Sequence, residues 1–287
     1  MLAATAEVAA LEDRIEAGLA ALDEALALLA GAEDSIHTRA VRAHVFVVQG
    51  RILRLAGRVR RAWVALARAT RAAEQSGEVR LAVEAAARRG RLMLDVDRED
   101  DAELELREAL LLARTTSDVR GEALVSLFLG TLLAERADGA DENSADRESR
   151  ATLERSLRLA VDLGLARIEA LCSAILARVD RRAGRLPAAL ARVEHAAALV
   201  NRFGAELLDR IVVEGTRALL LRESGRKRDG RKAASELRQR VVRENRAIRD
   251  RIVKKRHLAS AKALLDSALS PDGPLYPRVA LEGLENA

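Results

Sequence analysis

Arginine is the residue type whose placement in this sequence suggests chemistry. Six arginines lie one or four residues after a small residue that recurs along the chain: Arg51, Arg54, Arg91, Arg178, Arg181 and Arg222. Five such small residues define ten equivalent positions, and none of the ten is acidic. A guanidinium group can donate two parallel hydrogen bonds to a carboxylate or a phosphate. The pattern therefore predicts a surface that binds acidic groups. The alternative is that these arginines pair with acids of the same chain, such as Asp95 and Glu135, or are solvated.

The C-terminal region forms a second basic surface. Residues 222–257 contain 15 Lys and Arg against 5 Asp and Glu, whereas the whole chain has a formal net charge of +5. Seven of these cations are the candidate binding residues: Lys227, Arg228, Arg231, Lys232, Arg243, Lys254 and Lys255. The same segment carries an apolar stripe at Ala234, Leu237, Val241, Ile248 and Ile252. Such a helix could cap the preceding helices, contact a partner protein or bind nucleic acid, and its lack of aromatic side chains disfavours base stacking.

No residue pattern indicates a catalytic, metal or cofactor site. The four histidines are scattered without the spacing of metal ligands: His37, His44, His195 and His257. The motifs of phosphate-binding loops, serine hydrolases and zinc proteases are absent. The acidic stretch 137–149 lacks the register of a calcium-binding loop, and Cys172 lies in an apolar run typical of a packed thiol. We expect a protein that is not an enzyme and that holds neither metal nor cofactor.

The elements that must position the arginines are helices, because the chain is rich in Ala, Leu, Arg and Glu and poor in Pro. Its small residues recur in steps of 40, 40, 47 and 41, at Gly50, Gly90, Gly130, Ala177 and Ala218. The longer step contains seven extra residues within the acidic stretch. A turn glycine follows seven residues after three of the small residues, at Gly57, Gly184 and Gly225. Glycines typical of helix ends close the second helix of three units, at Gly77, Gly164 and Gly204.

The second half of each unit carries a small–large–small triplet with spacings of four and three residues. The first unit has Ala62, Leu66 and Ala69, and the fourth has Ala189, Val193 and Ala196. These spacings place all three residues on one helical face. We expect the small residues to let a neighbouring helix approach closely and the large one to fill the space between them.

These features resemble the tetratricopeptide repeat family over roughly residues 11–240. The repeats are about 40 residues long instead of the family's 34, and the family's Trp, Tyr and closing Pro are absent, as in the longer repeats of the MalT-like group of bacterial regulators. The resemblance implies an all-α, right-handed α-solenoid of about five helix pairs, with a concave groove lined by the first helix of each pair. It also implies that the six arginines face this groove, over an apolar floor that includes Val47 and Leu127.

The expected helices lie near residues 7–30, 34–56, 59–76, 78–96, 99–116, 118–136, 147–163, 165–183, 186–203, 205–224, 230–256 and 258–269, with a break near Lys254–His257. We divide the chain into a repeat array over 1–230, a basic helical segment over 231–270 that packs on the array, and an irregular tail over 271–287.

The sequence predicts a cytoplasmic protein, since no apolar run is long enough to cross a membrane and the N-terminus does not read as a signal peptide. The favoured function is a protein-interaction module, an adaptor, regulatory or sensor subunit, that holds an acidic segment of a partner in the groove. The alternatives are a nucleic-acid-binding protein that uses residues 226–256 and a scaffold that forms homo-oligomers. The oligomeric state itself stays open.

Overall fold

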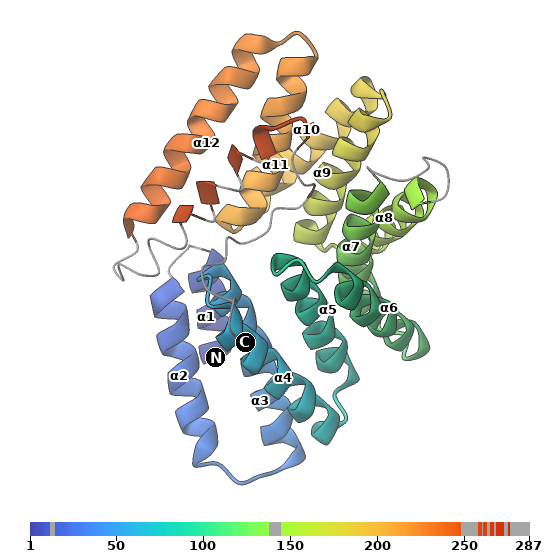
Figure 1. The fold of residues 1–287 in the computed structure, drawn as a ribbon. Helices are drawn as coiled ribbons and strands as arrows, with labels where there is room; N and C mark the ends of the chain where they lie inside the picture. Colours follow the sequence, from blue (N-terminus) through green and yellow to red (C-terminus); the bar gives the residue numbers. More distant parts are fainter. Residues whose placement is uncertain are drawn as a thin grey trace. The chain divides into compact units, whose positions relative to one another are not determined.

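The computed structural model has helices as its only regular secondary structure in the residues that it describes, which are 1–11, 15–137, 145–247, 258, 259, 261, 262, 265, 266, 268–272 and 275. No strand occurs among these residues, so the all-α prediction is confirmed. They form twelve helices (Figure 1): α1 Leu2–Leu11, α2 Ile15–Ala30, α3 Ile36–Leu55, α4 Val59–Ser76, α5 Val79–Asp95, α6 Glu99–Thr115, α7 Val119–Arg136, α8 Ala145–Asp162, α9 Ala166–Arg182, α10 Leu186–Phe203, α11 Leu207–Glu223 and α12 Lys227–Ala247.

The chain divides into two compact units, and the division falls inside α7. Unit 1 contains Met1–Gly121, and unit 2 contains Glu122–Asn245 together with Leu258–Arg278. The predicted division into 1–230 and 231–270 stays a prediction, and within unit 2 α12 packs against α11. In each unit, helices that follow one another in sequence pack as neighbours, such as α3 on α4 and α9 on α10. First helices also meet across the pairs, as α3 meets α5 and α9 meets α11.

The small residues of the repeat pattern lie where two helices approach closely. A Cβ atom on Gly50 would lie 2.6 Å from Leu66, one on Gly90 would lie 2.7 Å from Leu106, and one on Gly130 would lie 2.8 Å from Leu153. Each of these leucines is the large residue of a triplet, so each fills the space that the missing side chain leaves open. In the fourth sequence repeat Ala177 packs with Ala189 and Val193 in one core cluster. The expected role of the triplet is therefore present in these four repeats.

The helix turns use backbone conformations that glycine adopts readily. All six glycines predicted to form turns or helix ends have a positive φ: Gly57, Gly77, Gly164, Gly184, Gly204 and Gly225. Two further residues have a positive φ without being glycine, namely Asp97 and Ser117. Asp97 follows Gly90 by seven residues, and Ser117 follows Gly77 by 40. Both residues therefore occupy turn positions of the repeat, which the sequence does not indicate because neither residue is a glycine.

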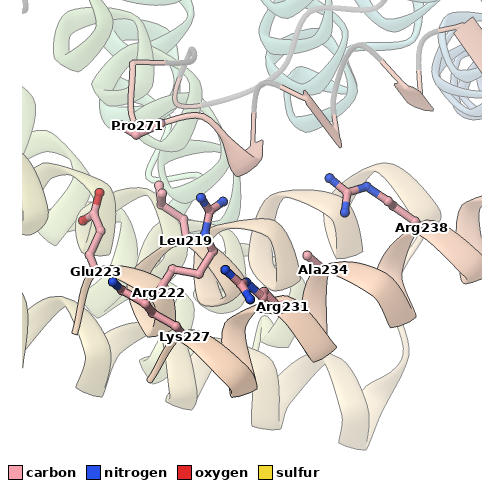
Figure 2. Close-up of a pocket in the computed structure, with 8 residues that line it drawn as sticks. All are labelled: Leu219, Arg222, Glu223, Lys227, Arg231, Ala234, Arg238 and Pro271. Atoms are coloured by element: carbon pink, nitrogen blue, oxygen red, sulfur yellow. The ribbon is translucent and has the colours of Figure 1, made fainter. Parts of the chain in front are cut away.

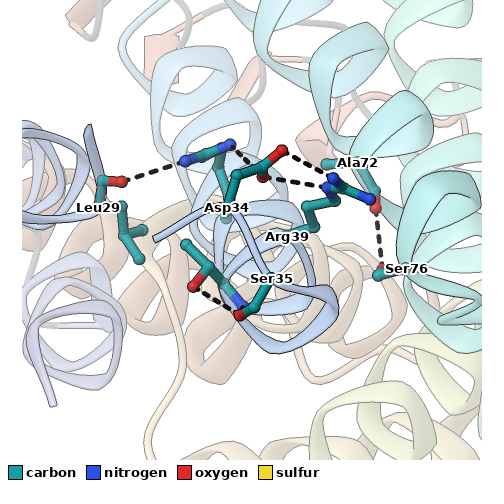
Figure 3. Close-up of polar contacts among 8 residues, drawn as sticks. Leu29, Asp34, Ser35, Arg39, Ala72 and Ser76 are labelled. Atoms are coloured by element: carbon teal, nitrogen blue, oxygen red, sulfur yellow. Dashed lines mark hydrogen bonds and ion pairs between the residues drawn. The ribbon is translucent and has the colours of Figure 1, made fainter. Parts of the chain in front are cut away.

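Side-chain hydrogen bonds stabilise the start of α3 and its connection to α2 (Figure 3). The hydroxyl of Ser35 accepts the backbone N–H of Thr38 at 3.1 Å, which satisfies one of the helix's unpaired donors. Arg39 donates two hydrogen bonds to the carboxylate of Asp34, and Arg42 donates one to the carbonyl oxygen of Leu29 at the end of α2. These contacts orient the connection between α2 and α3.

Two helix boundaries differ from the prediction. The helix expected over 7–30 is two helices, α1 and α2, and residues 12–14 between them lie outside the described part. The helix expected from 230 begins at Lys227. Gly230 is an internal position of α12, and a Cβ there would lie 2.7 Å from the carbonyl oxygen of Ala218. Glycine is thus needed for the close approach of α12 to α11. The break expected near Lys254–His257 lies outside the described residues.

Candidate functional site

The arginines of unit 1 that were expected to line a groove bind acids of their own unit. Arg54 donates two hydrogen bonds to the carboxylate of Asp95, at 2.5 and 3.1 Å, and Arg91 reaches the same carboxylate at 3.3 Å. The side chains of Asp95, Arg91 and Arg54 are 0, 4 and 13 % exposed. The alternative interpretation, pairing with Asp95, therefore describes Arg54 and Arg91 in this structure.

The third arginine of unit 1 contacts the N-terminal helix. Arg51 lies 3.8 Å from the carboxylate of Glu7 in α1, and its side chain is largely buried. α1 packs against both α2 and α3. The first helix of the chain thus covers the part of α3 that the sequence pattern assigned to a ligand.

In unit 2, Arg181 forms the same kind of contact as Arg54. It donates from Nε to Glu223 at 2.7 and 2.9 Å. Arg54 lies four residues after the small residue Gly50, and Asp95 lies five residues after the next small residue, Gly90. In the same way, Arg181 lies four residues after Ala177, and Glu223 lies five residues after Ala218. The ion pair therefore repeats between successive first helices, from α3 to α5 and from α9 to α11. At these positions arginine joins neighbouring helix pairs.

Arg178 is buried and binds the C-terminal segment of its own chain. It is 1 % exposed, and its two terminal nitrogens donate to the carbonyl oxygens of Ala268 at 3.4 Å and Ser270 at 3.3 Å. Arg181 donates to the carbonyl oxygen of Pro271 at 2.8 Å. We call residues 258–275, of which 258, 259, 261, 262, 265, 266, 268–272 and 275 are described, the C-terminal strap.

The expected apolar floor belongs to the core. Val47 is 2 % exposed and packs with Phe46, Ala69 and Ala85, and Leu127 is 1 % exposed. In an α-helix of a two-layer packing, such side chains point into the layer between helices and do not form a ligand surface. Val47 and Leu127 are therefore core residues and are not available as a floor in this structure.

A basic cleft of about 550 Å³ lies in unit 2 between α11, α12 and the strap (Figure 2). Its lining contains four cations, one acid and three apolar residues: Arg222, Lys227, Arg231, Arg238, Glu223, Leu219, Ala234 and Pro271. Figure 2 shows the arginine side chains pointing from the two helices into the space below the segment that carries Pro271. The acid is already paired with Arg181. Among the described residues, no acidic side chain forms an ion pair with any of the four cations of the lining.

The cleft joins residues that the sequence placed in two different sites. Arg222 was expected in the groove, whereas Lys227 and Arg231 were expected on the basic surface. Arg238 was not predicted. The signal was present, because the α12 residues of the lining are spaced by four, three and four residues, which places them on one helical face.

The other predicted cations of the C-terminal surface lie outside this cleft. Arg228 and Arg243 are exposed on α12, and Lys232 is an exposed side chain 3.9 Å from Glu236. Lys254 and Lys255 lie outside the described residues. Of the apolar stripe, Ala234, Leu237 and Val241 are buried within the chain.

The described residues show no further reactive constellation. None of them forms a group of three or more His, Cys, Asp or Glu side chains able to hold a metal ion. Burial raises the pKa of the Cys172 thiol to about 12, although its hydrogen bond to Ser156 acts in the opposite direction. The thiol is therefore protonated near neutral pH and unreactive. In the part of the chain that is described, no helix is long and apolar enough to cross a membrane.

Comparison with models of known protein families gives no match, and comparison with curated proteins gives none either.

Proposed function

We propose that this protein is a non-catalytic interaction module that binds an acidic segment of a partner protein in the basic cleft of unit 2. The observation that carries the proposal is the charge of the lining. Four cations converge there, and the single acid, Glu223, is already paired with Arg181. A concentration of unneutralised positive charge in a concave site attracts a ligand of opposite charge.

The dimensions of the cleft favour an extended peptide segment. From Lys227 to Arg238 the helix rises about 16 Å, at 1.5 Å per residue. An extended chain covers this distance with about five residues, at roughly 3.3 Å each. Leu219, Ala234 and Pro271 add an apolar lining on which a hydrophobic side chain can pack. The expected ligand is therefore a short segment in which acidic residues alternate with apolar ones.

A peptide titration with charge-reversed variants tests this function. The probe is a fluorescent octapeptide in which Glu alternates with Leu, and the measurement is anisotropy. The variant Arg222→Glu/Arg231→Glu/Arg238→Glu removes the cleft cations, and we expect its affinity to fall at least about tenfold, since three partly exposed charge contacts together contribute roughly 1.4 kcal/mol or more.

The matched control reverses charge on the same helix outside the cleft. Arg228→Glu/Arg243→Glu changes two exposed cations that do not line it. We expect the control to lose clearly less affinity for the octapeptide than the triple variant, because Arg228 and Arg243 do not line the cleft and act on a bound segment only through screened charge at longer range. Equal losses in both variants would contradict the proposal, since they would reflect the general charge of α12.

We also propose that the helix pairs are tetratricopeptide-like repeats arranged as a right-handed solenoid in the cytoplasm. Two recurring features support the repeat: the packing of Gly50, Gly90 and Gly130 on triplet leucines, and the ion pairs of Arg54 and Arg181 with the next first helix. A crystal structure would test the handedness and the number of repeats.

Nucleic acid is a second candidate ligand because α12 exposes Arg228, Lys232 and Arg243 beyond the cleft. Filter binding with a single-stranded oligonucleotide tests it. Affinity should fall steeply with salt, and Arg228→Glu/Arg243→Glu should weaken it. If the oligonucleotide binds and the octapeptide does not, nucleic acid is the ligand. Homo-oligomerisation through the apolar stripe has less support, because Ala234, Leu237 and Val241 are already buried within one chain.

A further inference from the structure

We infer that the C-terminal strap is a dockable wall of the basic cleft, and that docking of the strap and binding of the acidic segment stabilise each other. This inference rests on the proposed function, because it concerns regulation of the same cleft. Three observations in unit 2 support it. Arginines bind the backbone of the strap, the strap adds Pro271 to the lining of the cleft, and no acidic side chain of its described residues lies in that lining.

The strap is held by arginines that bind its backbone. Arg178 donates to the carbonyl oxygens of Ala268 and Ser270, and Arg181 donates to that of Pro271. Carbonyl oxygens at the end of a helical segment have no partner within the helix, so a buried guanidinium group is well suited to satisfy them. These contacts fix the strap at the point where it reaches the cleft.

The strap packs closely against α11 at Gly215. A Cβ atom added to Gly215 would lie 2.5 Å from the Cβ atom of Ala268, and the three nearest atoms all belong to Ala268. The absence of a side chain at Gly215 is therefore required by the docked strap. Among the described residues of the strap, the buried side chains are those of Ala261, Leu265, Ala268, Leu269 and Leu275. A segment that packs on its unit through one row of apolar side chains can open locally without unfolding of the whole unit.

The docked strap forms one wall of the cleft through Pro271 (Figure 2). Arg181 connects this wall to the opposite lining, because it binds Pro271 through one nitrogen and Glu223 through another. Removing the strap would remove this wall, and with it every contact that a ligand between Pro271 and the α12 cations makes with the strap. The four cations are exposed even with the strap in place, so docking acts by adding contacts to the ligand. Binding of an anion between the walls is therefore favoured by docking.

The strap does not compete for the cations. Its described acids, Asp266 and Asp272, are exposed, and neither of them lines the cleft. An inhibitory segment that imitates the ligand would place a carboxylate against Arg222, Arg231 or Arg238. Among the described strap residues only Pro271 lies in the lining, so the strap borders the cleft without filling it.

Hydrogen exchange of the full chain, followed by mass spectrometry over residues 258–275, tests the coupling. If only the docked state binds the Glu–Leu octapeptide, protection of strap amides rises by the factor 1 + [L]/Kd, about 100-fold at a concentration of 100 Kd. Unchanged strap exchange at saturating octapeptide would overturn the inference. Failure of the unmodified protein to bind the octapeptide would instead overturn the proposed function, and that result is read separately by anisotropy.

Substitution at Gly215 separates docking from folding. Gly215→Ala places a Cβ against Ala268, but it also favours the helical conformation of α11. We expect strap exchange to accelerate at least about tenfold and octapeptide affinity to fall, while α11 keeps its protection. Gly215→Ala/Ala268→Gly restores the space and should restore both properties. Arg178→Met removes the hydrogen bonds and should act like Gly215→Ala. If strap exchange is unchanged in both single variants, or if it accelerates without loss of affinity, the inference is wrong.

Discussion

The assignment of Arg54 and Arg91 to internal ion pairs predicts a large effect of Asp95→Asn on unit 1. Asparagine has nearly the same shape as aspartate, but it carries no charge and offers an NH₂ group where the second carboxylate oxygen accepts hydrogen bonds. The change leaves two guanidinium groups close together without their shared anion.

The burial of the three side chains sets the magnitude. Asp95 has no exposed side-chain surface, and Arg54 and Arg91 are 13 and 4 % exposed. Removing one partner of a buried ion pair costs about 3–5 kcal/mol, because the remaining charge is desolvated and uncompensated. We expect a loss of this size in the free energy of unfolding of unit 1.

Urea unfolding followed by tryptophan fluorescence measures this loss. Trp63, the chain's single tryptophan, lies in α4 of unit 1 and therefore reports on that unit. Asp101→Asn is the matched control, since Asp101 pairs with Arg98 in the same unit while both side chains are at least half exposed. An exposed pair of this kind contributes roughly 0.2–1 kcal/mol.

The competing interpretation gives a different result. If Arg54 and Arg91 served mainly to bind an acidic partner, Asp95→Asn would cost no more than Asp101→Asn and would increase affinity for the octapeptide. That outcome would refute the structural role. A further check replaces the whole group by apolar residues of similar size, Arg54→Met/Asp95→Leu/Arg91→Met, which should recover most of the lost stability because no charge is left uncompensated.

Three further changes test the turns and the buried acids. Ser117→Gly should stabilise unit 1 by about 0.5–1 kcal/mol in urea unfolding, since serine at positive φ is strained although glycine makes the unfolded chain more flexible. Burial raises the pKa of Asp180, but hydrogen bonds from Arg150 and Arg185 outweigh it, so the pKa lies below its ordinary value of 3.8. The stability that Asp180 contributes should be complete above that pH and be lost on further acidification, so urea midpoints of the unmodified protein and Asp180→Asn should converge below about pH 4. Burial raises the pKa of Glu214 above 4.5 despite nearby Arg217, so Glu214→Gln should slow hydrogen exchange of α11 at pH 7 and lose this advantage below about pH 4.5.

The fold could be predicted where local sterics decide it. Turn glycines such as Gly57 and Gly184 mark positions that most residues avoid, and Gly50 marks a close approach that any side chain would block. Asp97 and Ser117 were missed because they take the same backbone conformation at some cost and carry no glycine to reveal it. The strap and α12 were harder to place, since short apolar stripes do not identify the surface that they cover.

The candidate site was predictable in residue type, but the sequence did not reveal which acceptors several of its arginines reach within the chain. A guanidinium group signals an anion or a carbonyl oxygen, but a long flexible side chain does not reveal which acceptor it reaches. Asp95 could be named in advance as a possible partner because it is an acid near the right helix end. The acceptors of Arg178 are backbone oxygens of Ala268 and Ser270, which carry no sequence signal. Arg238 escaped notice because its role depends on which face of α12 meets α11.

The position of the basic cleft follows from the end of the ion-pair pattern. Arg54 is neutralised by Asp95 and Arg181 by Glu223, acids that lie 41 and 42 residues further along the chain. Arg222 occupies the same repeat position, but 41 and 42 residues after it the sequence has Ala263 and Leu264, which carry no charge. Instead of an acid, Arg222 meets Lys227, Arg231 and Arg238 in one cleft.

Like charges held together destabilise a folded protein unless an anion neutralises them. A cation that only joined helix pairs would have no function after the last pair, and the neighbouring face of α12 could then be neutral. Instead, α12 places three cations, Lys227, Arg231 and Arg238, beside Arg222, where the repeated ion-pair pattern has no further acid. The site that we propose for an external anion thus begins with the arginine that ends the internal pattern, and Arg178 and Arg181 hold the strap beside it.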